Sequence, residues 1–207
     1  MALSTYAELQ AAIASELFDR ADADDVIPRF IRLAEVQMQR ELRHYQMVKR
    51  ATASIDSRYT ELPVDHLQTI RFHLDGKSSP LEFVSPDAMA DHRAAYQNAT
   101  GEPRYMAFTG NTFEVFPTPN ATYTGELQYY RTIPALSDAN PTNWLLTDHP
   151  DAYLYGALLA AGAHFADADL TKRSTALYMG AVSSINEVSM RQQFPGPMRM
   201  QFKRGRQ

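Results

Sequence analysis

Residues that could carry catalytic or ligand-binding chemistry are spread thinly along this chain of 207 residues. There is no cysteine, which excludes disulfides, thiolate metal sites and cysteine nucleophiles. No two of the histidines have the i, i+4 spacing of a helical metal site; they are His44, His66, His73, His92, His149 and His164. Carboxylate pairs such as Glu61 with Asp65 resemble ordinary surface charges as much as an acid–base pair. We therefore expect no catalytic residue, no metal site and no cofactor.

Two segments resemble binding motifs but lack residues that those motifs need. Residues 19–25 are acidic like a calcium loop, but Ile27 and Leu33 occupy the positions of its glycine and its last glutamate. Residues 75–79, Asp-Gly-Lys-Ser-Ser, resemble the end of a phosphate-binding loop, yet Arg71 stands where the earlier glycine should be. For the aspartates of residues 19–25, helix capping is a better explanation than calcium binding.

Aromatic residues are frequent in the middle of the chain: Tyr105, Phe108, Phe113, Phe116, Tyr123, Tyr129 and Tyr130. Such residues can stack on single-stranded nucleic acid or on sugars. They are equally typical of half-buried strands in a small sheet, which is the interpretation we favour. A nucleic-acid-binding or carbohydrate-binding module is kept as an alternative function, and a hydrolase using scattered carboxylates and histidines ranks below it.

Residues 150–167 form the stretch around which the other elements are expected to be organised. At 100° per residue, apolar side chains surround this helix almost completely, so it must be buried. Gly156, Ala160 and Ala163 form a strip of small side chains that would let a neighbouring backbone approach closely. His164, near the end of the helix, is expected to be a core residue rather than a ligand.

Two further helices are predicted at the N-terminal end. Thr5 and Glu8 match a capping box, which would start a helix ending near residue 19. Residues 26–47 form the clearest amphipathic helix, with an apolar face made of Ile27, Ile31, Ala34, Met38, Leu42 and Tyr45. Its opposite face carries four arginines: Arg29, Arg32, Arg40 and Arg43. This face would be solvated in a monomer and would be a natural subunit contact if the protein assembles.

Between residues 51 and 133 the apolar spacing changes from helical to alternating. Nine of the twelve prolines also lie between residues 63 and 150, which favours short strands and irregular connections. A small antiparallel sheet is expected here. Its elements are hairpins formed by residues 105–109 with 112–116 and by 70–74 with 81–83, a strand over 123–131, and a short helix over 85–96. Residues 134–144 are expected to be irregular.

The chain ends in a predicted helix and a basic segment. The helix starts near residue 170, and its inward residues are expected to be Leu177, Ala181, Ile185 and Val188. Residues 194–207 form an extended arm with apolar and basic side chains: Phe194, Met198, Arg199, Met200, Phe202, Lys203, Arg204 and Arg206. The net charge of the chain is −4. Four of these residues are cations (Arg199, Lys203, Arg204 and Arg206), so the part of the chain before the arm has a net charge near −8. A basic arm suggests docking to an acidic partner or nucleic acid, although solubilising termini are common.

These elements predict an α+β protein: a four-helix bundle of two N-terminal and two C-terminal helices, with an inserted small antiparallel β domain. Expected domain bounds are residues 1–50 and 148–193 for the helical pairs, 51–147 for the insert and 194–207 for the arm. The lack of cysteine suggests a reducing cytoplasm. Neither a signal peptide nor an apolar run of roughly 20 residues is present, so we expect neither export nor membrane insertion.

Several segments along essentially the whole chain share features with one known family. They are residues 30–35 (Phe-Ile-Arg-Leu-Ala-Glu), 40–43 (Arg-Glu-Leu-Arg), 61–65 (Glu-Leu-Pro-Val-Asp), 101–105 (Gly-Glu-Pro-Arg-Tyr), 116–119 (Phe-Pro-Thr-Pro), 127–130 (Leu-Gln-Tyr-Tyr), 140–146 (Asn-Pro-Thr-Asn-Trp-Leu-Leu) and 149–156 (His-Pro-Asp-Ala-Tyr-Leu-Tyr-Gly). In this order they resemble the head-to-tail adaptor, or connector, proteins of tailed bacteriophages, particularly the type of short-tailed phages. None of these segments carries a catalytic motif.

The resemblance implies a structural virion protein that is not an enzyme. Such adaptors form a ring, usually of twelve copies, beneath the portal protein, and they are assembled in the host cytoplasm. The ring would continue the channel for double-stranded DNA without sequence-specific binding, and would present a platform for the next tail component, a nozzle or tail tube. The C-terminal arm would reach onto the portal, and the four arginines would contact a neighbouring subunit. A neck or tail-completion protein is the alternative within this class.

An acidic body suits such a channel, because cationic walls would bind the DNA phosphates strongly.

Overall fold

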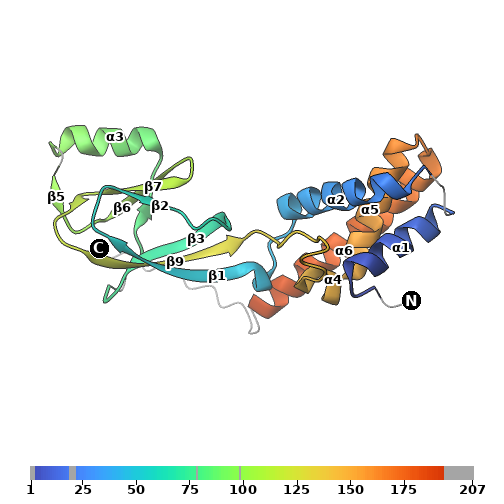
Figure 1. The fold of residues 1–207 in the computed structure, drawn as a ribbon. Coiled ribbons are helices and arrows are strands. Elements are labelled where there is room, and N and C mark those ends of the chain that lie inside the picture. Colours follow the sequence, from blue (N-terminus) through green and yellow to red (C-terminus); the bar gives the residue numbers. More distant parts are fainter. Residues whose placement is uncertain (1–2, 19–21, 78, 98, 194–207) are drawn as a thin grey trace. The chain divides into compact units, whose positions relative to one another are not determined.

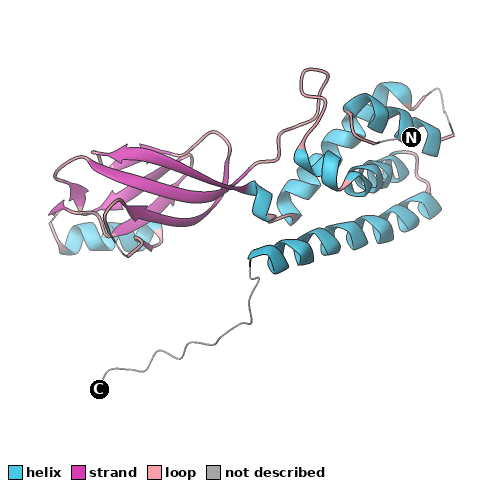
Figure 2. Ribbon diagram, turned by 90° about the horizontal axis from the view of Figure 1, so that it is seen from below, coloured by secondary structure: helices cyan, strands magenta, loops and turns pink. Residues whose placement is uncertain are grey.

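The computed structural model describes residues 3–18, 22–77, 79–97 and 99–193 (Figure 1). The chain divides into two compact units, Met1–Gln46 with Ile133–Gln207, and Met47–Thr132. In the described residues the first unit is helical and the second is mostly β-strand (Figure 2). The expected α+β class is therefore confirmed.

The helical unit is built on one central helix. Its helices are α1 (Tyr6–Glu16), α2 (Ile27–Glu41), α4 (Trp144–Asp148), α5 (Pro150–His164) and α6 (Ala168–Gln193), with a 3₁₀ turn at Asp24–Val26. Helix α5 packs against each of the other four, most extensively against α6 and α2 (Figure 1). The expected burial is confirmed for residues 152–162, each of which is buried or half-buried, whereas Ala163 and His164 at the end of the helix are exposed. Helix α4 was not predicted; it begins at Trp144, the last residue of the stretch expected to be irregular. The four-helix bundle as such stays a prediction.

The two N-terminal helices start as predicted but end earlier. Thr5 accepts a hydrogen bond from the Glu8 backbone N–H at 3.3 Å, and the Glu8 carboxylate accepts one from the Thr5 N–H at 3.0 Å, which confirms the capping box. Helix α2 ends at Glu41 because Leu42 is already extended, with φ −90° and ψ 136°. A second 3₁₀ turn follows at Tyr45–Met47, and it leaves Tyr45 partly exposed.

Glycines rather than alanines allow the closest helix contacts around α5. A Cβ atom at Gly156 would lie 3.0 Å from Ala34 Cβ on α2 and 3.3 Å from the Tyr178 ring on α6. A Cβ atom at Gly162 would lie 2.9 Å from the Thr171 backbone nitrogen. The prediction that small side chains allow a close approach is therefore confirmed at Gly156. It is wrong at Ala163, which is exposed.

Helix α6 turns a different face inward from the one predicted. Ala181 and Ile185 are buried as expected, but Leu177 and Val188 are 42% and 37% exposed. The remaining buried positions are Ser174, Tyr178 and Ser189. The Tyr178 hydroxyl donates to Glu41 Oε2 at 2.8 Å, and Ser189 Oγ donates to the Arg43 carbonyl at 3.2 Å. Two polar side chains with partners at the end of α2 therefore belong to the inner face, which apolar spacing alone could not show.

In its described residues, the β unit contains three small sheets and one helix. The first has the order β1 (Val48–Ile55), β9 (Tyr123–Arg131), β3 (His66–Leu74), all antiparallel. The second has the order β2 (Tyr59–Glu61), β7 (Thr112–Phe116), β6 (Tyr105–Thr109), β4 (Glu82–Phe83), and the third pairs β5 (Thr100–Gly101) with β8 (Thr118–Pro119). The predicted short helix is confirmed as α3 (Pro86–Ala95), and Ser85 caps its start. The hairpin of β6 and β7 is confirmed, with Phe108 opposite Phe113.

The two larger sheets share one hydrophobic core, made of Ile55, Phe72, Leu74, Leu81, Met106, Phe113, Val115, Leu127 and Tyr129. The expected hairpin of residues 70–74 with 81–83 is wrong, because β3 pairs with β9 while β4 pairs with β6. One backbone bond, from the Leu81 N–H to the Phe72 carbonyl, joins the two segments before the chain crosses to the other sheet. The pairs β4 with β6 and β5 with β8 are parallel, so the insert is not purely antiparallel.

Candidate interaction surface

The four arginines expected on one face of the second helix are placed in two ways. Arg29, Arg32 and Arg40 are exposed on α2. Arg43 follows the helix end, and its Nη1 donates to the carbonyls of Leu42 at 2.6 Å and Gln39 at 3.1 Å. The Arg43 side chain thus contacts backbone carbonyls that the end of α2 leaves without helical partners.

The exposed part of α2 is mixed rather than purely basic. Leu33 is 52% exposed, and it lies in the sequence next to Arg32. At the start of the helix, Arg29 Nη2 lies 3.2 Å from His164 Nδ1. His164 is exposed, so the expectation that it belongs to the core is wrong. We call Arg32, Leu33 and Arg40 the arginine face.

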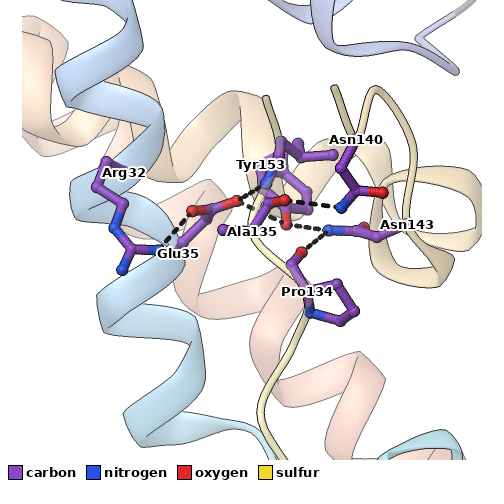
Figure 3. A network of polar contacts seen from close by, with 8 residues as sticks. Arg32, Glu35, Pro134, Ala135, Asn140, Asn143 and Tyr153 are labelled. Atoms are coloured by element: carbon purple, nitrogen blue, oxygen red, sulfur yellow. Dashed lines mark hydrogen bonds and ion pairs between the residues drawn. The ribbon is translucent and has the colours of Figure 1, made fainter. Parts of the chain in front are cut away.

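Directly behind this face lies a buried carboxylate. Glu35 is 5% exposed; one of its oxygens accepts from Arg32 Nη1 at 3.0 Å, and the other accepts from the Leu136 N–H at 2.7 Å (Figure 3). The Tyr153 hydroxyl lies 3.5 Å from the second oxygen. Burial, and to a lesser degree the nearby Glu35 charge, raises the pKa of Tyr153 well above its usual value, so the phenol stays protonated.

Asn143 completes this network from the start of α4. Its Nδ2 donates to the Tyr153 hydroxyl at 2.7 Å and to the Pro134 carbonyl at 2.8 Å, and its Oδ1 accepts from the Leu146 N–H at 2.8 Å (Figure 3). The network fixes the irregular segment before α4 onto α2 and α5. Because every group in it has a structural partner, we interpret it as support for the arginine face rather than as a reaction site.

Two of the six histidines, distant in sequence, meet in the helical unit. The His44 ring stacks on the Trp144 ring at 4.9 Å with an interplanar angle of 10°, and its centroid lies 5.9 Å from that of His149. Burial lowers the pKa of His44, and the charge of His149 adds to this effect while Asp148 opposes it. In the described residues, no group of three or more side chains is placed to bind a metal ion.

We expect acid to destabilise the helical unit through His44. Its pKa is lower in the folded than in the unfolded chain, so its contribution is fully present above about pH 6.5 and is lost as pH falls through the folded pKa. Trp144 is the only tryptophan, and its fluorescence can follow unfolding in urea at pH 7.5 and 5.5. His44→Phe, which keeps an aromatic ring, should reduce the pH dependence. An unchanged pH dependence in that variant would contradict the assignment.

The remaining chemical candidates of the sequence do not converge in the β unit. Asp65 accepts from Lys49 Nζ at 2.8 Å and from the Tyr129 hydroxyl at 2.7 Å, while Glu61 is exposed on β2. The seven aromatic residues between Tyr105 and Tyr130 that could have formed a stacking platform are all buried or half-buried. Three of them are buried: Phe113, Phe116 and Tyr129. Their placement favours strand packing over an open stacking platform.

Comparison with known protein families decides the class of the protein. The model of the SU10 adaptor protein family matches residues 4–201, which is nearly the whole chain. This chain belongs to the SU10 adaptor protein family. No curated protein matches it. Membership supports the resemblance to phage adaptor proteins, whereas the short-tailed type stays a prediction. In the part of this SU10 adaptor that the structure describes, each helix is too short or too polar to cross a membrane.

For an SU10 adaptor the relevant surfaces are those that other proteins can contact. Besides the arginine face, the end of α1 exposes Phe18, whose side chain is 92% accessible. The predicted portal-docking arm, residues 194–207, lies outside the described residues. The arginines and the arm could be identified from the sequence, whereas Phe18 could not, because helical periodicity ends before that residue.

Proposed function

We propose that this SU10 adaptor is a structural virion protein that joins the portal to the tail. Identical copies form a ring, with twelve as the expected number, and the ring continues the channel for double-stranded DNA. The next tail component, a nozzle or tail tube, binds its other side. The protein acts without enzymatic activity, at the head–tail interface of the virion, after assembly in the host cytoplasm. The observation that carries this proposal is the family match over residues 4–201.

Two features of the chain support this proposal. The arginine face offers exposed cations with a leucine among them, a composition typical of protein contacts. The chain outside residues 194–207 has a net charge near −8, which would keep passing DNA from binding tightly to it. In the same proposal, the apolar and basic side chains of the arm dock on the portal: Phe194, Met198, Arg199, Met200, Phe202, Lys203, Arg204 and Arg206.

Removing the arm is expected to abolish portal binding without unfolding the protein. A chain that ends at Gln193 keeps all the described helices and strands, so its circular dichroism and thermal midpoint should match those of the full chain. Co-sedimentation with the portal ring encoded in the same genome, followed by electron microscopy, measures the binding. A matched full-length variant with Arg199, Lys203, Arg204 and Arg206 changed to glutamine separates charge from apolar contacts. Full portal binding by the shortened chain would remove the role of the arm.

A further inference from the structure

A groove opens at one end of the helical unit, between the C-terminal end of α1 and the start of α6. Its volume is about 320 Å³, and its apolar lining consists of Leu17, Phe18, Phe165 and Leu170. Its charged lining consists of Glu16, Asp167, Asp169 and Arg173. Among the described residues of the lining, Arg173 is the one cation beside these three carboxylates, and its Nη2 lies 3.8 Å from Glu16 Oε2. The groove therefore combines apolar surface with negative charge.

One apolar side of this groove is formed by Phe18, whose backbone conformation and exposure are both unusual. It lies directly after the helix end, with φ 58°, in the left-handed region where glycine is the common residue. A bulky side chain is disfavoured in that conformation, and the Phe18 ring gains little from the described part of its own chain because it is 92% exposed. Both costs are understandable if another molecule covers the ring. Exposed aromatic rings beside an apolar groove are typical of contact sites between proteins.

The arginine face of α2 has the complementary properties. Leu33 is an exposed apolar side chain in a helix surface that also carries Arg32 and Arg40. Arg32 remains accessible although it pairs with Glu35, because its side chain is 64% exposed. An apolar side chain between cations fits an apolar groove between carboxylates, both by burial of Leu33 and by opposite charge.

We propose that the groove at Phe18 binds the arginine face of a second copy of this chain. The proposal rests on the proposed ring and names the two surfaces that would meet in it. A head-to-tail contact uses two different surfaces of each copy, so it can be repeated until a ring closes, whereas a contact between identical surfaces stops at a dimer. The groove and the arginine face are two different surfaces of the same helical unit.

Disulfide trapping tests this contact directly, because the chain has no cysteine of its own. Full-length Ala168→Cys and Gln37→Cys variants, one carrying a mass tag, are mixed in equal amounts and oxidised mildly, with and without the portal ring. Ala168 lies between Asp167 and Asp169 of the groove, and Gln37 follows Leu33 by one helical turn, so both variants keep Phe18 and Leu33. The expected product is the mixed dimer, at least about tenfold above either homodimer, since disulfides form only between close and well-oriented positions. A statistical distribution of the three dimers in both conditions would overturn the proposal.

Two controls keep the experiment decisive. Val64→Cys, fully exposed on the β unit, mixed with Gln37→Cys should give the statistical distribution. Phe18→Gly relieves the left-handed conformation, so its thermal midpoint should equal or exceed that of the wild type while ring formation is lost. A Phe18→Gly variant that unfolds earlier would instead show a role within the monomer and would contradict the proposal.

The contact and the portal role can fail separately. Mixed dimers without portal binding would refute only the portal role, and portal binding with statistical dimers would refute only this contact.

Discussion

Replacing Asn143 by alanine is expected to destabilise the helical unit by about 3 kcal/mol. Asn143 is 8% exposed, and it makes three hydrogen bonds that alanine cannot make. The lost N-cap of α4 accounts for about 1 kcal/mol. The remainder arises because the Pro134 carbonyl and the Tyr153 hydroxyl lose a donor in a site that water reaches poorly, at about 1 kcal/mol or more each.

The neighbouring Asn140 provides a matched control for this prediction. Its Nδ2 also donates to a backbone carbonyl, that of Ala135 at 2.8 Å, but the contact is exposed and water can replace it (Figure 3). Asn140→Ala should therefore cost less than about 1 kcal/mol. Urea unfolding followed by Trp144 fluorescence measures both free energies. Equal losses for the two variants would show that the buried network does not fix the segment before α4.

Local signals in the sequence were enough to predict several elements of the fold. The capping box at Thr5, the burial of α5 and the hairpin with Gly110-Asn111 at its turn depend on neighbours in the sequence, and all three are observed. The inner face of α6 was mispredicted because Tyr178 and Ser189 are buried through hydrogen bonds to residues more than a hundred positions away. Such partners are decided by the tertiary structure and leave no periodic signal.

The candidate surfaces show the same division between local and tertiary information. The arginines of α2 could be placed on one helix side by counting residues, as far as the helix continues. The groove at Phe18 could not be predicted, because its lining comes from the ends of α1 and α5 and the start of α6, which meet only in the folded chain. The left-handed conformation of Phe18 was equally hidden, since a glycine would be the usual sign of it.

In the β unit, Gly125→Ala is expected to cost about 2 to 3 kcal/mol. A Cβ atom at Gly125 on β9 would lie 2.4 Å from Phe72 Cζ and 3.0 Å from Ile55 Cγ1. Both side chains belong to the shared core of the two larger sheets and are almost completely buried, so neither can move into solvent. The strand must shift or the Phe72 ring must leave its preferred rotamer, and either response weakens the core.

Two further variants test the cause of this loss. Gly180→Ala on α6 should instead stabilise the protein by up to about 1 kcal/mol, because a Cβ atom there meets nothing within 4 Å and alanine favours the helix. Phe72→Leu combined with Gly125→Ala should cost less than the sum of the two single changes, since the smaller side chain leaves room for the added methyl group. Circular dichroism during urea unfolding measures the four variants, Phe72→Leu alone included, against the wild type. Strict additivity would mean that the Gly125 methyl group is accommodated without contact to Phe72, and the steric explanation would then fail.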